Sequence, residues 1–160
     1  MDRLGPYSVT QLRDISSLYE PTKENGTVVY SAIDAPAQAT REALEKGIPI
    51  VLLWRDTPSF GHFILLHIRG TERRPDVELF DPLGTTSEDD SWASYMDDPN
   101  GLNGGGLRPL LQEMDATGYT VSFNHPHNAP QEDNTNSCGL WCLLRSAFPN
   151  HSPSRFAAMA

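Results

Sequence analysis

The two cysteines of the chain, Cys138 and Cys142, lie in an apolar segment that directly follows a polar, turn-rich one. The apolar run predicts a helix over residues 138–148, with Cys138 in its first turn. A thiol at a helix N-terminus meets unpaired N–H groups and the positive end of the helix dipole, so it ionises more easily. Cys138 is therefore a candidate nucleophile, beside which Gly139 leaves room for a substrate carbonyl. Cys142 lies one turn deeper and is expected to fill space in the core.

Two alternatives to a nucleophile remain open at this point. Buried cysteines are most often core residues without chemistry. Histidines of the preceding loop could also complete a zinc site, whose ligands would be His125, His127, Cys138 and Cys142. The C-x3-C spacing on a helix is not the usual spacing of a zinc knuckle. The choice depends on whether a base and an orienting acid can reach Cys138.

A nucleophilic cysteine needs an imidazole within hydrogen-bond reach, held in place by a third polar group. Residues 61–68 and 76–82 predict two antiparallel strands joined by a polar loop centred near position 72. In such a hairpin His62 faces a residue near position 82, and Asp81 lies within one position of that place. Both would lie at the same open edge of the sheet, which favours His62 as the base and Asp81 as its orienting acid. A slip of one residue in this register would turn Asp81 to the other face.

His67 lies on the same predicted strand, but at the turn end of the hairpin. The acids near it there, Asp76 and Glu78, are expected in a solvated loop context, so His67 is the weaker candidate for the base. A single histidine on a strand is most often an ordinary surface or core residue, and FDPLG is an ordinary exit from a strand into a turn. Each motif alone is weak evidence, but with Cys138 they form an ordered set.

Four further residues complete the candidate site. Gln131 lies seven residues before Cys138, and its amide could join the Cys138 backbone N–H in stabilising an oxyanion; the plainer alternative is a loop glutamine that faces water. Three aromatic residues are candidates for substrate binding, although each is as easily a core residue: Trp54, Phe63 and Trp141. If Trp54 and Phe63 wall a narrow groove, the substrate should carry glycine or alanine immediately before the scissile bond.

The candidate catalytic residues occur along the chain in the order His62, Asp81, Gln131, Cys138. This order, with a glutamine seven residues before a Cys-Gly pair, resembles the adenovirus-endopeptidase-like cysteine proteases, a clan that includes the SUMO- and ubiquitin-like-protein proteases. The matching stretches are GHFILLHI, VELFDPLG and QEDNTNSCGLWC, within about residues 45 to 148. The resemblance implies a papain-like site reached by a different chain order, with the four roles assigned above. Phe63 stands where many members of the clan have tryptophan, so an aromatic surface is kept beside the histidine without an indole N–H.

By this resemblance the chain is expected to be a cysteine peptidase that processes a viral polyprotein or precursor. It would act as a monomer, without a cofactor, on a protein or peptide substrate. It would work in the cytoplasm or nucleus of an infected host cell rather than outside it. One alternative is a deubiquitinase or deSUMOylase that acts on host conjugates of a ubiquitin-like protein. Another is a non-catalytic, zinc-stabilised binding domain.

Charge and length limit the classes of function. The chain of 160 residues carries a formal charge of −9, which argues against nucleic acid or an anionic membrane as the main partner, because both require basic surface. The longest apolar runs, IPIVLLW and FILLHI, are too short to span a bilayer.

The N-terminus lacks the pattern of a signal peptide, and two cysteines at this spacing make no disulfide framework, so a reducing compartment is the default. The length fits one peptidase domain over residues 1–148, followed by a tail over residues 149–160.

Apolar periodicity predicts the elements that must position these residues. Helices are predicted over residues 9–20, 34–47, 107–118 and 138–148. Strands are predicted over residues 26–33, 48–54, 61–68, 76–82 and 119–124. Residues 83–106 form a long loop, whose acidic part, residues 86–98, is either solvated or meets a basic partner. The order of elements predicts an α+β fold, and the resemblance a papain-like core with a mixed, mainly antiparallel sheet flanked by helices.

Overall fold

The protein forms one mixed sheet of five strands between two layers of helices. A computed structural model describes residues 8–18, 26–35, 37–58, 61–82, 95–124 and 138–159. The strands follow one another across the sheet in chain order: β1 (Val28–Ser31), β2 (Ile50–Arg55), β3 (Gly61–Thr71), β4 (Arg74–Phe80) and β5 (Thr120–Phe123). The central pairs β2–β3 and β3–β4 are antiparallel, and the outer pairs β1–β2 and β4–β5 are parallel. The predicted α+β fold with a mixed sheet is confirmed, with a parallel pair at each edge.

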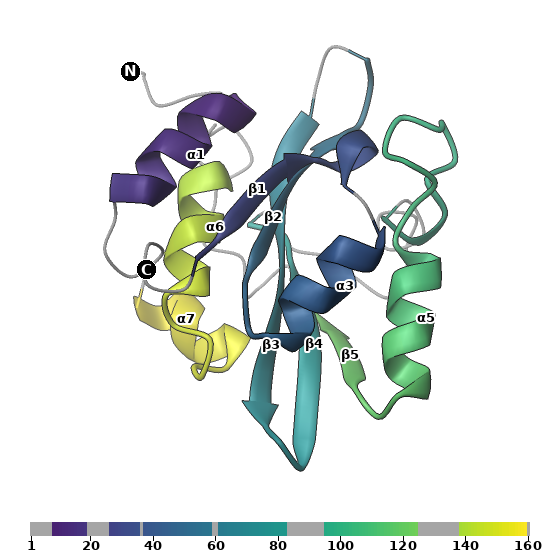
Figure 1. Cartoon of the computed structure of the whole chain (residues 1–160). Coiled ribbons are helices and arrows are strands. Elements are labelled where there is room, and N and C mark those ends of the chain that lie inside the picture. The colour runs from purple at the N-terminus through teal and green to yellow at the C-terminus, as the bar shows by residue number, and fades with distance from the viewer. Residues whose placement is uncertain are drawn as a thin grey trace.

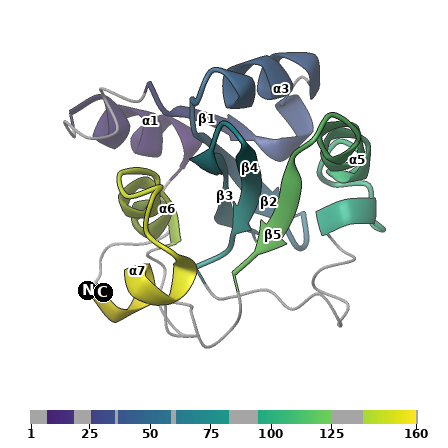
Figure 2. The same ribbon diagram turned by 90° about the horizontal axis from the view of Figure 1, so that it is seen from below.

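The helices divide between the two faces of this sheet. Each parallel pair requires a crossover connection, and these pass through a short 3-10 helix η1 (Ala32–Asp34) with α3 (Ala37–Glu45), and through α5 (Arg108–Ala116). Both crossover helices cover the same face, as Figures 1 and 2 show. The opposite face is covered by α1 (Val9–Leu18), α6 (Cys138–Ser146) and α7 (Pro153–Met159). Among the helices of the described ranges, none has the length and apolar character needed to cross a membrane.

Side chains alternate between the two faces of each strand, so the sheet contributes to two cores. The α3/α5 core is formed, among others, by Ile64, Leu66, Leu79, Leu111 and Met114. The α1/α6/α7 core is formed, among others, by Leu12, Leu65, Phe80, Leu143 and Phe156. Burying both faces explains why β2 and β3 read as continuous apolar runs rather than as alternating ones.

The β3–β4 hairpin sets the relative position of the candidate base and acid. Leu66 pairs with Leu79. This register differs by one residue from the predicted one, in which His62 faces position 82. Directly opposed residues of an antiparallel pair share a face. Because side chains alternate, His62 lies on the face of Leu66, and Asp81 lies on the face of Leu79. The observed register therefore brings the two onto one face, as diagonal neighbours at the open end of the hairpin.

The second half of the long loop is ordered by a buried carboxylate. Asp98, at φ 48°, accepts backbone N–H bonds from Asn103 and Gly105 at 2.9 Å each. The Asn103 amide in turn bonds both backbone groups of Arg55 at the end of β2, at 2.7 and 2.9 Å. The expectation of a solvated acidic segment over residues 86–98 is wrong for Asp98, which is only 6% exposed. Residues 83–94 lie outside the described ranges.

The C-terminal segment also differs from the expected tail. Residues 153–159 form α7, and its Phe156 is buried in the α1/α6/α7 core. The Phe156 ring meets Phe80 of β4 edge to face, with 5.7 Å between ring centroids. The helix is therefore packed on the sheet, because one large aromatic side chain anchors it.

Candidate active site

His62 and Asp81 come together at the end of the sheet. His62 is the second residue of β3, and Asp81 follows directly after β4. The His62 Nε2 atom lies 3.2 Å from Asp81 Oδ2. The side chain of Asp81 is 5% exposed and that of His62 is 15% exposed. The two residues that the sequence selects as base and orienting acid thus form a hydrogen-bonded, largely buried pair.

Tyr95 and Asp56 complete the contacts of the His62 ring. The Tyr95 hydroxyl lies 2.8 Å from His62 Nε2 and donates a hydrogen bond to Asp81 Oδ2. On the other side of the ring, Nδ1 lies 3.0 Å from Asp56 Oδ2. Asp56 is the first residue after β2 and its side chain is 57% exposed. Both ring nitrogens therefore have carboxylate partners, one of them buried and one of them exposed.

These partners determine the charge of the imidazole. Burial lowers the pKa of His62, but the hydrogen bonds and negative charges of Asp56 and Asp81 outweigh burial and raise the pKa to about 10. Burial raises the pKa of Tyr95 well above its usual range, and the nearby charge of Asp81 raises it further. At neutral pH the site therefore holds an imidazolium and a protonated phenol around a carboxylate.

Asn124 fixes the backbone of Asp81. The Asp81 N–H donates to Asn124 Oδ1, and Asn124 Nδ2 donates to the Asp81 carbonyl, both at 2.7 Å. Asn124 follows β5 directly and is fully buried. A buried amide that satisfies both backbone groups of one residue holds its side chain in a defined direction. The end of β5 thereby orients Asp81 toward His62.

The helix of the candidate nucleophile begins against Phe63, the residue that follows His62 in β3. α6 begins at Cys138. A Cβ atom on Gly139 would lie 3.0 Å from a ring carbon of Phe63 and 3.0 Å from a methyl carbon of Leu12. A larger residue at this position would require Leu12 or Phe63 to shift, and the residues that follow Cys138 and His62 in sequence are packed against each other. The side chain of Cys138 lies outside the described part of the structure.

The remaining predicted site residues are distributed as follows. Cys142 is fully buried in the α1/α6/α7 core, in the space-filling position expected for it. Gln131 and the two histidines of the alternative zinc site, His125 and His127, lie outside the described residues. Within the described ranges, no group of three or more His, Cys, Asp or Glu side chains is arranged to hold a metal ion.

The aromatic residues proposed for substrate binding occupy different places. Trp54 pairs with His62 across β2–β3 and belongs to the α3/α5 core, whereas Phe63 belongs to the α1/α6/α7 core. Both are 2% exposed, so they fill opposite faces of the sheet rather than wall one groove. Trp141 is half-buried on α6 and meets Phe156 edge to face at 6.4 Å between centroids.

His67 and Glu78 have a different setting from the one expected. They pair directly across the β3–β4 hairpin and are 2% and 0% exposed, so Glu78 is not in a solvated loop. Glu78 Oε1 lies 3.1 Å from His67 Nε2 and 2.7 Å from Arg145 Nη2 of α6. Burial raises the pKa of Glu78, but His67 and Arg145 outweigh this and lower it to about 2. The second histidine of β3 thus belongs to a buried ionic cluster that joins the hairpin to α6.

Sequence reasoning missed Tyr95, Asp56 and Asn124. Tyr95 lies in a segment that the sequence predicts as a loop, and its composition predicts no contact with the sheet. No local sequence pattern indicates that its hydroxyl contacts His62. Asp56 and Asn124 do carry a usable signal, because each directly follows a predicted strand. Polar side chains at strand ends gather at one edge of a sheet, which is where both are found.

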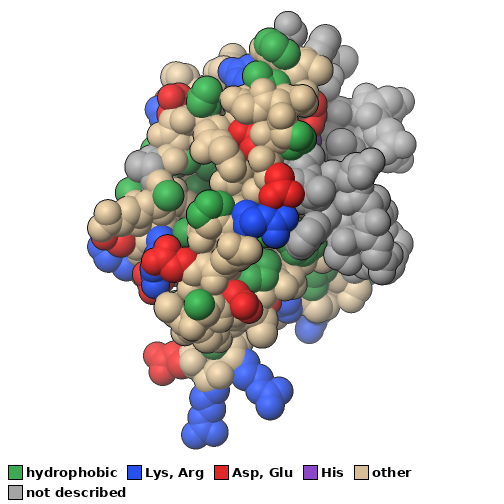
Figure 3. Space-filling model, turned by 90° about the vertical axis from the view of Figure 1, so that its right-hand side faces the viewer, with side chains coloured by type: hydrophobic (Ala, Val, Ile, Leu, Met, Phe, Trp, Pro, Cys, Tyr) green, Lys and Arg blue, Asp and Glu red, His purple; other side chains and the backbone are tan. Residues whose placement is uncertain are grey.

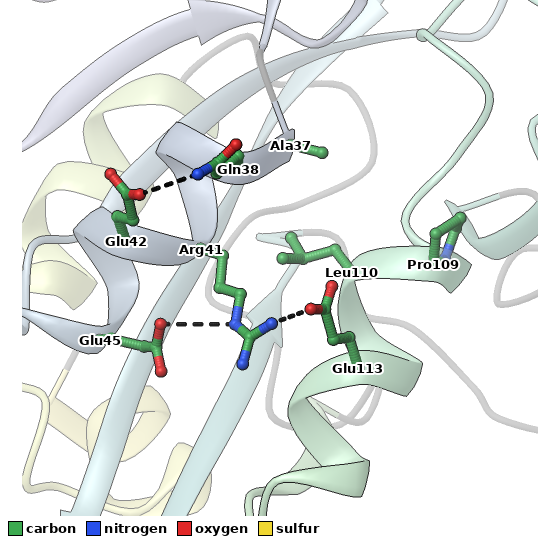
Figure 4. A pocket seen from close by; sticks show the side chains of 8 residues that line it. All are labelled: Ala37, Gln38, Arg41, Glu42, Glu45, Pro109, Leu110 and Glu113. Carbon is green, nitrogen blue, oxygen red and sulfur yellow. Dashed lines mark hydrogen bonds and ion pairs between the residues drawn. The ribbon is translucent and has the colours of Figure 1, made fainter.

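The helical face of α3 and α5 carries a separate groove of about 460 Å³. Figure 3 shows this face, and Figure 4 shows Arg41 between the carboxylates of Glu45 and Glu113. The groove is lined in part by Gln38, Arg41, Glu42, Glu45, Leu110 and Glu113. It includes no residue of the His62 cluster or of α6, and its one arginine is already paired.

Comparison with solved structures gives a fold match. The chain is similar to the ASFV pS273R protease, with a TM-score of 0.52 and 14% sequence identity. The match covers 98% of this chain but 61% of that protease, so this chain spans less than two thirds of its length. No protein-family model matches the sequence, and no curated protein matches it. The comparison therefore shows that the α+β fold described above is one that also occurs in a protease.

Proposed function

We propose that the protein is a cysteine peptidase with Cys138 as nucleophile, His62 as base and Asp81 as the acid that orients it. The observation that carries this proposal is the buried His62–Asp81 pair, with 3.2 Å between Nε2 and Oδ2, at the end of the sheet where α6 begins. A base held by a carboxylate beside a helix N-terminus is the arrangement that activates a thiol. The fold shared with a protease supports the same class of reaction.

The contacts of His62 assign a task to each ring nitrogen. Asp81 and Tyr95 hold Nε2, so Nδ1 is the nitrogen available to the thiol and later to the leaving amine. Because His62 is an imidazolium at neutral pH, it pairs with Cys138 as the thiolate and keeps the Nδ1 proton for the leaving amine. The thiolate of Cys138 then bonds the scissile carbonyl carbon, the C–N bond breaks, and His62 gives its proton to the amine. Water hydrolyses the thioester in the second half of the reaction. Asp56 lies on Nδ1 and has to move away for the thiol to reach it.

The oxyanion that forms on the carbonyl needs donors. The backbone N–H of Cys138 is free of an intrahelical partner because it opens α6. The amide of Gln131, seven residues earlier, is proposed as the second donor. Removing one oxyanion donor typically costs about 2.7–4 kcal/mol in transition-state stabilisation.

The proposed substrate is a protein or peptide, cut during processing of a viral polyprotein or precursor in the cytoplasm or nucleus of an infected cell. The resemblance in sequence order and the fold shared with the ASFV protease support this choice over removal of a ubiquitin-like protein. Enzymes of the clan that the sequence resembles often take segments with small residues, frequently glycine, and this supports glycine or alanine before the scissile bond. Trp54 and Phe63 are core residues, so they do not form the narrow groove expected for this preference.

The direct test uses activity probes on the purified protein. A Gly-Gly propargylamide or vinyl-sulfone probe should label the wild type and the matched control Cys142→Ala, and should not label Cys138→Ala. The same terminus should be compared on a short peptide, on ubiquitin and on SUMO. Labelling of Cys142 instead of Cys138, or equal peptidase activity in all three proteins, would remove Cys138 from the site. Reaction only with an intact ubiquitin-like protein would identify a deconjugating enzyme instead.

A further inference from the structure

The hydroxyl of Tyr95 joins the two halves of the His62–Asp81 pair. It donates to Asp81 Oδ2 and lies 2.8 Å from His62 Nε2, closer than the 3.2 Å between Nε2 and the carboxylate itself. Since the hydroxyl proton goes to Asp81, the phenolic oxygen is left to accept the Nε2–H of His62. The chain of donors therefore runs from the imidazole through the phenol to the carboxylate.

The ring of Tyr95 leaves this hydroxyl little freedom to move. Tyr95 is 3% exposed and packs edge to face on Trp54, with 5.2 Å between ring centroids. Trp54 is the cross-strand partner of His62, and the Tyr95 and His62 rings are 6.1 Å apart at 76°. The rings of Trp54, Tyr95 and His62 therefore pack against one another at the end of β2 and β3, and the Tyr95 hydroxyl lies at the Nε2 edge of the imidazole.

The loop that carries Tyr95 is anchored to the same end of the sheet. The Tyr95 carbonyl accepts the N–H of Leu107 at 2.9 Å, which closes the loop. The side chain of Asp98 orders the turn between them, and Asn103 bonds the backbone of Arg55, next to Asp56. The loop is thus fixed at both of its contacts with the site, at Tyr95 and beside Asp56.

We propose that Tyr95 is a positioning residue of the reaction, which accepts the Nε2–H of His62 and passes the interaction on to Asp81, so that only Nδ1 is presented to the thiol. The inference rests on the proposed peptidase function, but it assigns a role that the four-residue set lacks. A phenol serves this purpose because it can accept from one partner while it donates to the other. The raised pKa of Tyr95 keeps its proton in place over the working range of the enzyme.

Tyr95→Phe removes the hydroxyl and keeps the ring on Trp54. We expect kcat to fall about ten- to hundredfold, the range for one hydrogen bond to a charged group, with KM within about twofold. The basic limb of the pH–rate profile should move to lower pH, because the imidazolium of His62 loses the phenolic oxygen that accepts its Nε2–H and favours its charged form. Tyr30→Phe on β1 is the matched control and should change neither quantity. A purely structural role would lower activity without moving the basic limb.

Two further variants keep the proposal testable. 3-Fluorotyrosine at position 95 retains the hydroxyl and should restore kcat to within a few-fold of wild type, even if Tyr95→Phe folds poorly. In an Asp81→Asn background, Tyr95→Phe should cost no more than about threefold, because residues that act as a unit are not additive. A full additional loss there would show that Tyr95 does not act through Asp81.

The outcomes separate this proposal from the proposed function. An active wild type with an equally active Tyr95→Phe variant would overturn the role of Tyr95 and leave the peptidase intact. A wild type with neither peptidase activity nor labelling of Cys138 would overturn both. An NMR titration of His62 needs no substrate: its midpoint should shift in Tyr95→Phe and not in Tyr30→Phe, and an unchanged midpoint would refute the contact itself.

Discussion

Glu78 of β4 and Arg145 of α6 form an ion pair with 2.7 Å between Oε1 and Nη2, and neither side chain exposes any surface to solvent. His67 bonds the same oxygen, and the Arg145 guanidinium lies 5.2 Å from the centre of the Phe156 ring. The pair joins the hairpin that carries His62 and Asp81 to the helix that begins at Cys138.

Breaking this pair from one side should destabilise the fold strongly. Arg145→Met leaves the buried carboxylate of Glu78 with His67 at 3.1 Å and with Arg69, whose Nε lies 3.8 Å from Glu78 Oε1. We expect a loss of about 3–5 kcal/mol in the free energy of unfolding. Arg155→Met, on the exposed side of α7, is the control and should cost no more than about 0.5 kcal/mol. Denaturant unfolding of both variants measures the difference, and equal stabilities would contradict a structural role for the pair.

The same cluster predicts how stability depends on acid. The pKa of Glu78 is lowered from 4.5 to about 2, so its stabilising contribution is complete above pH 4.5 and is lost as the pH falls through 2. The difference in stability between wild type and Glu78→Gln should therefore be largest near neutral pH and should shrink toward pH 2. Thermal melts between pH 7 and pH 2.5 test this. A difference that stays constant over this range would show that Glu78 gains nothing from its charge.

The two histidines of β3 should give opposite phenotypes. His62→Ala is expected to lower activity by several orders of magnitude while the protein stays folded, because the ring lies at the open end of the sheet. His67→Ala removes a buried partner of Glu78, so it should lower the melting temperature and leave the activity of the folded fraction largely unchanged. Circular dichroism melts beside peptidase assays separate the two effects. Exchange of the two phenotypes would make His67 the base.

The exposed carboxylate of Asp56 should control the upper pH limit of activity. With Asp81 it outweighs burial and raises the pKa of His62 to about 10, so Asp56→Asn should lower that pKa. The stability that His62 contributes is complete below pH 6.5 and is lost as the pH rises through 10. In Asp56→Asn this loss, and the basic limb of the pH–rate profile, should begin at lower pH. NMR titration of His62 measures the shift, with the exposed Asp34→Asn as control.

Gly139 should not tolerate even one added methyl group. A Cβ there would lie 3.0 Å from side-chain carbons of Leu12 and Phe63, so Gly139→Ala should displace the start of α6 and cost about 1–3 kcal/mol. It should also lower peptidase activity, because the helix carries Cys138. Combining it with Leu12→Ala provides space, so the double variant should be more stable than the sum of the two single losses predicts. Strict additivity would show that Leu12 is not the obstacle.

Most elements of the fold follow from apolar patterning, and the His62–Asp81 pair follows from treating residues 61–82 as a hairpin. The exact register does not follow, because the polar turn allows neighbouring pairings. That difference of one residue decides the outcome: Leu66 opposite Leu79 puts Asp81 on the same face as His62. The sequence thus predicts which residues meet, while the packing of the two cores decides how.

Glu78 and Arg145 show what sequence pattern cannot reveal. Glu78 alternates with the apolar residues of β4, which is typical of a strand with one solvated face. A single arginine in an apolar helix is likewise expected to reach solvent. Because helices cover both faces of this sheet, the polar position of β4 is buried too, and the two charges neutralise each other inside. Tyr95 escaped prediction for a related reason, since only the folded loop brings it back to the sheet.

The turn around Asp98 has a consequence for how the loop responds to insertions and to solvent. Its backbone amides at Asn103 and Gly105 are committed to a buried carboxylate, so they should exchange with deuterium slowly despite the surrounding glycines. An insertion between residues 98 and 105 would break these bonds and release Asn103 from Arg55. Insertions or deletions in this turn should therefore not be tolerated, because its hydrogen bonds fix the spacing between the end of β2 and Tyr95.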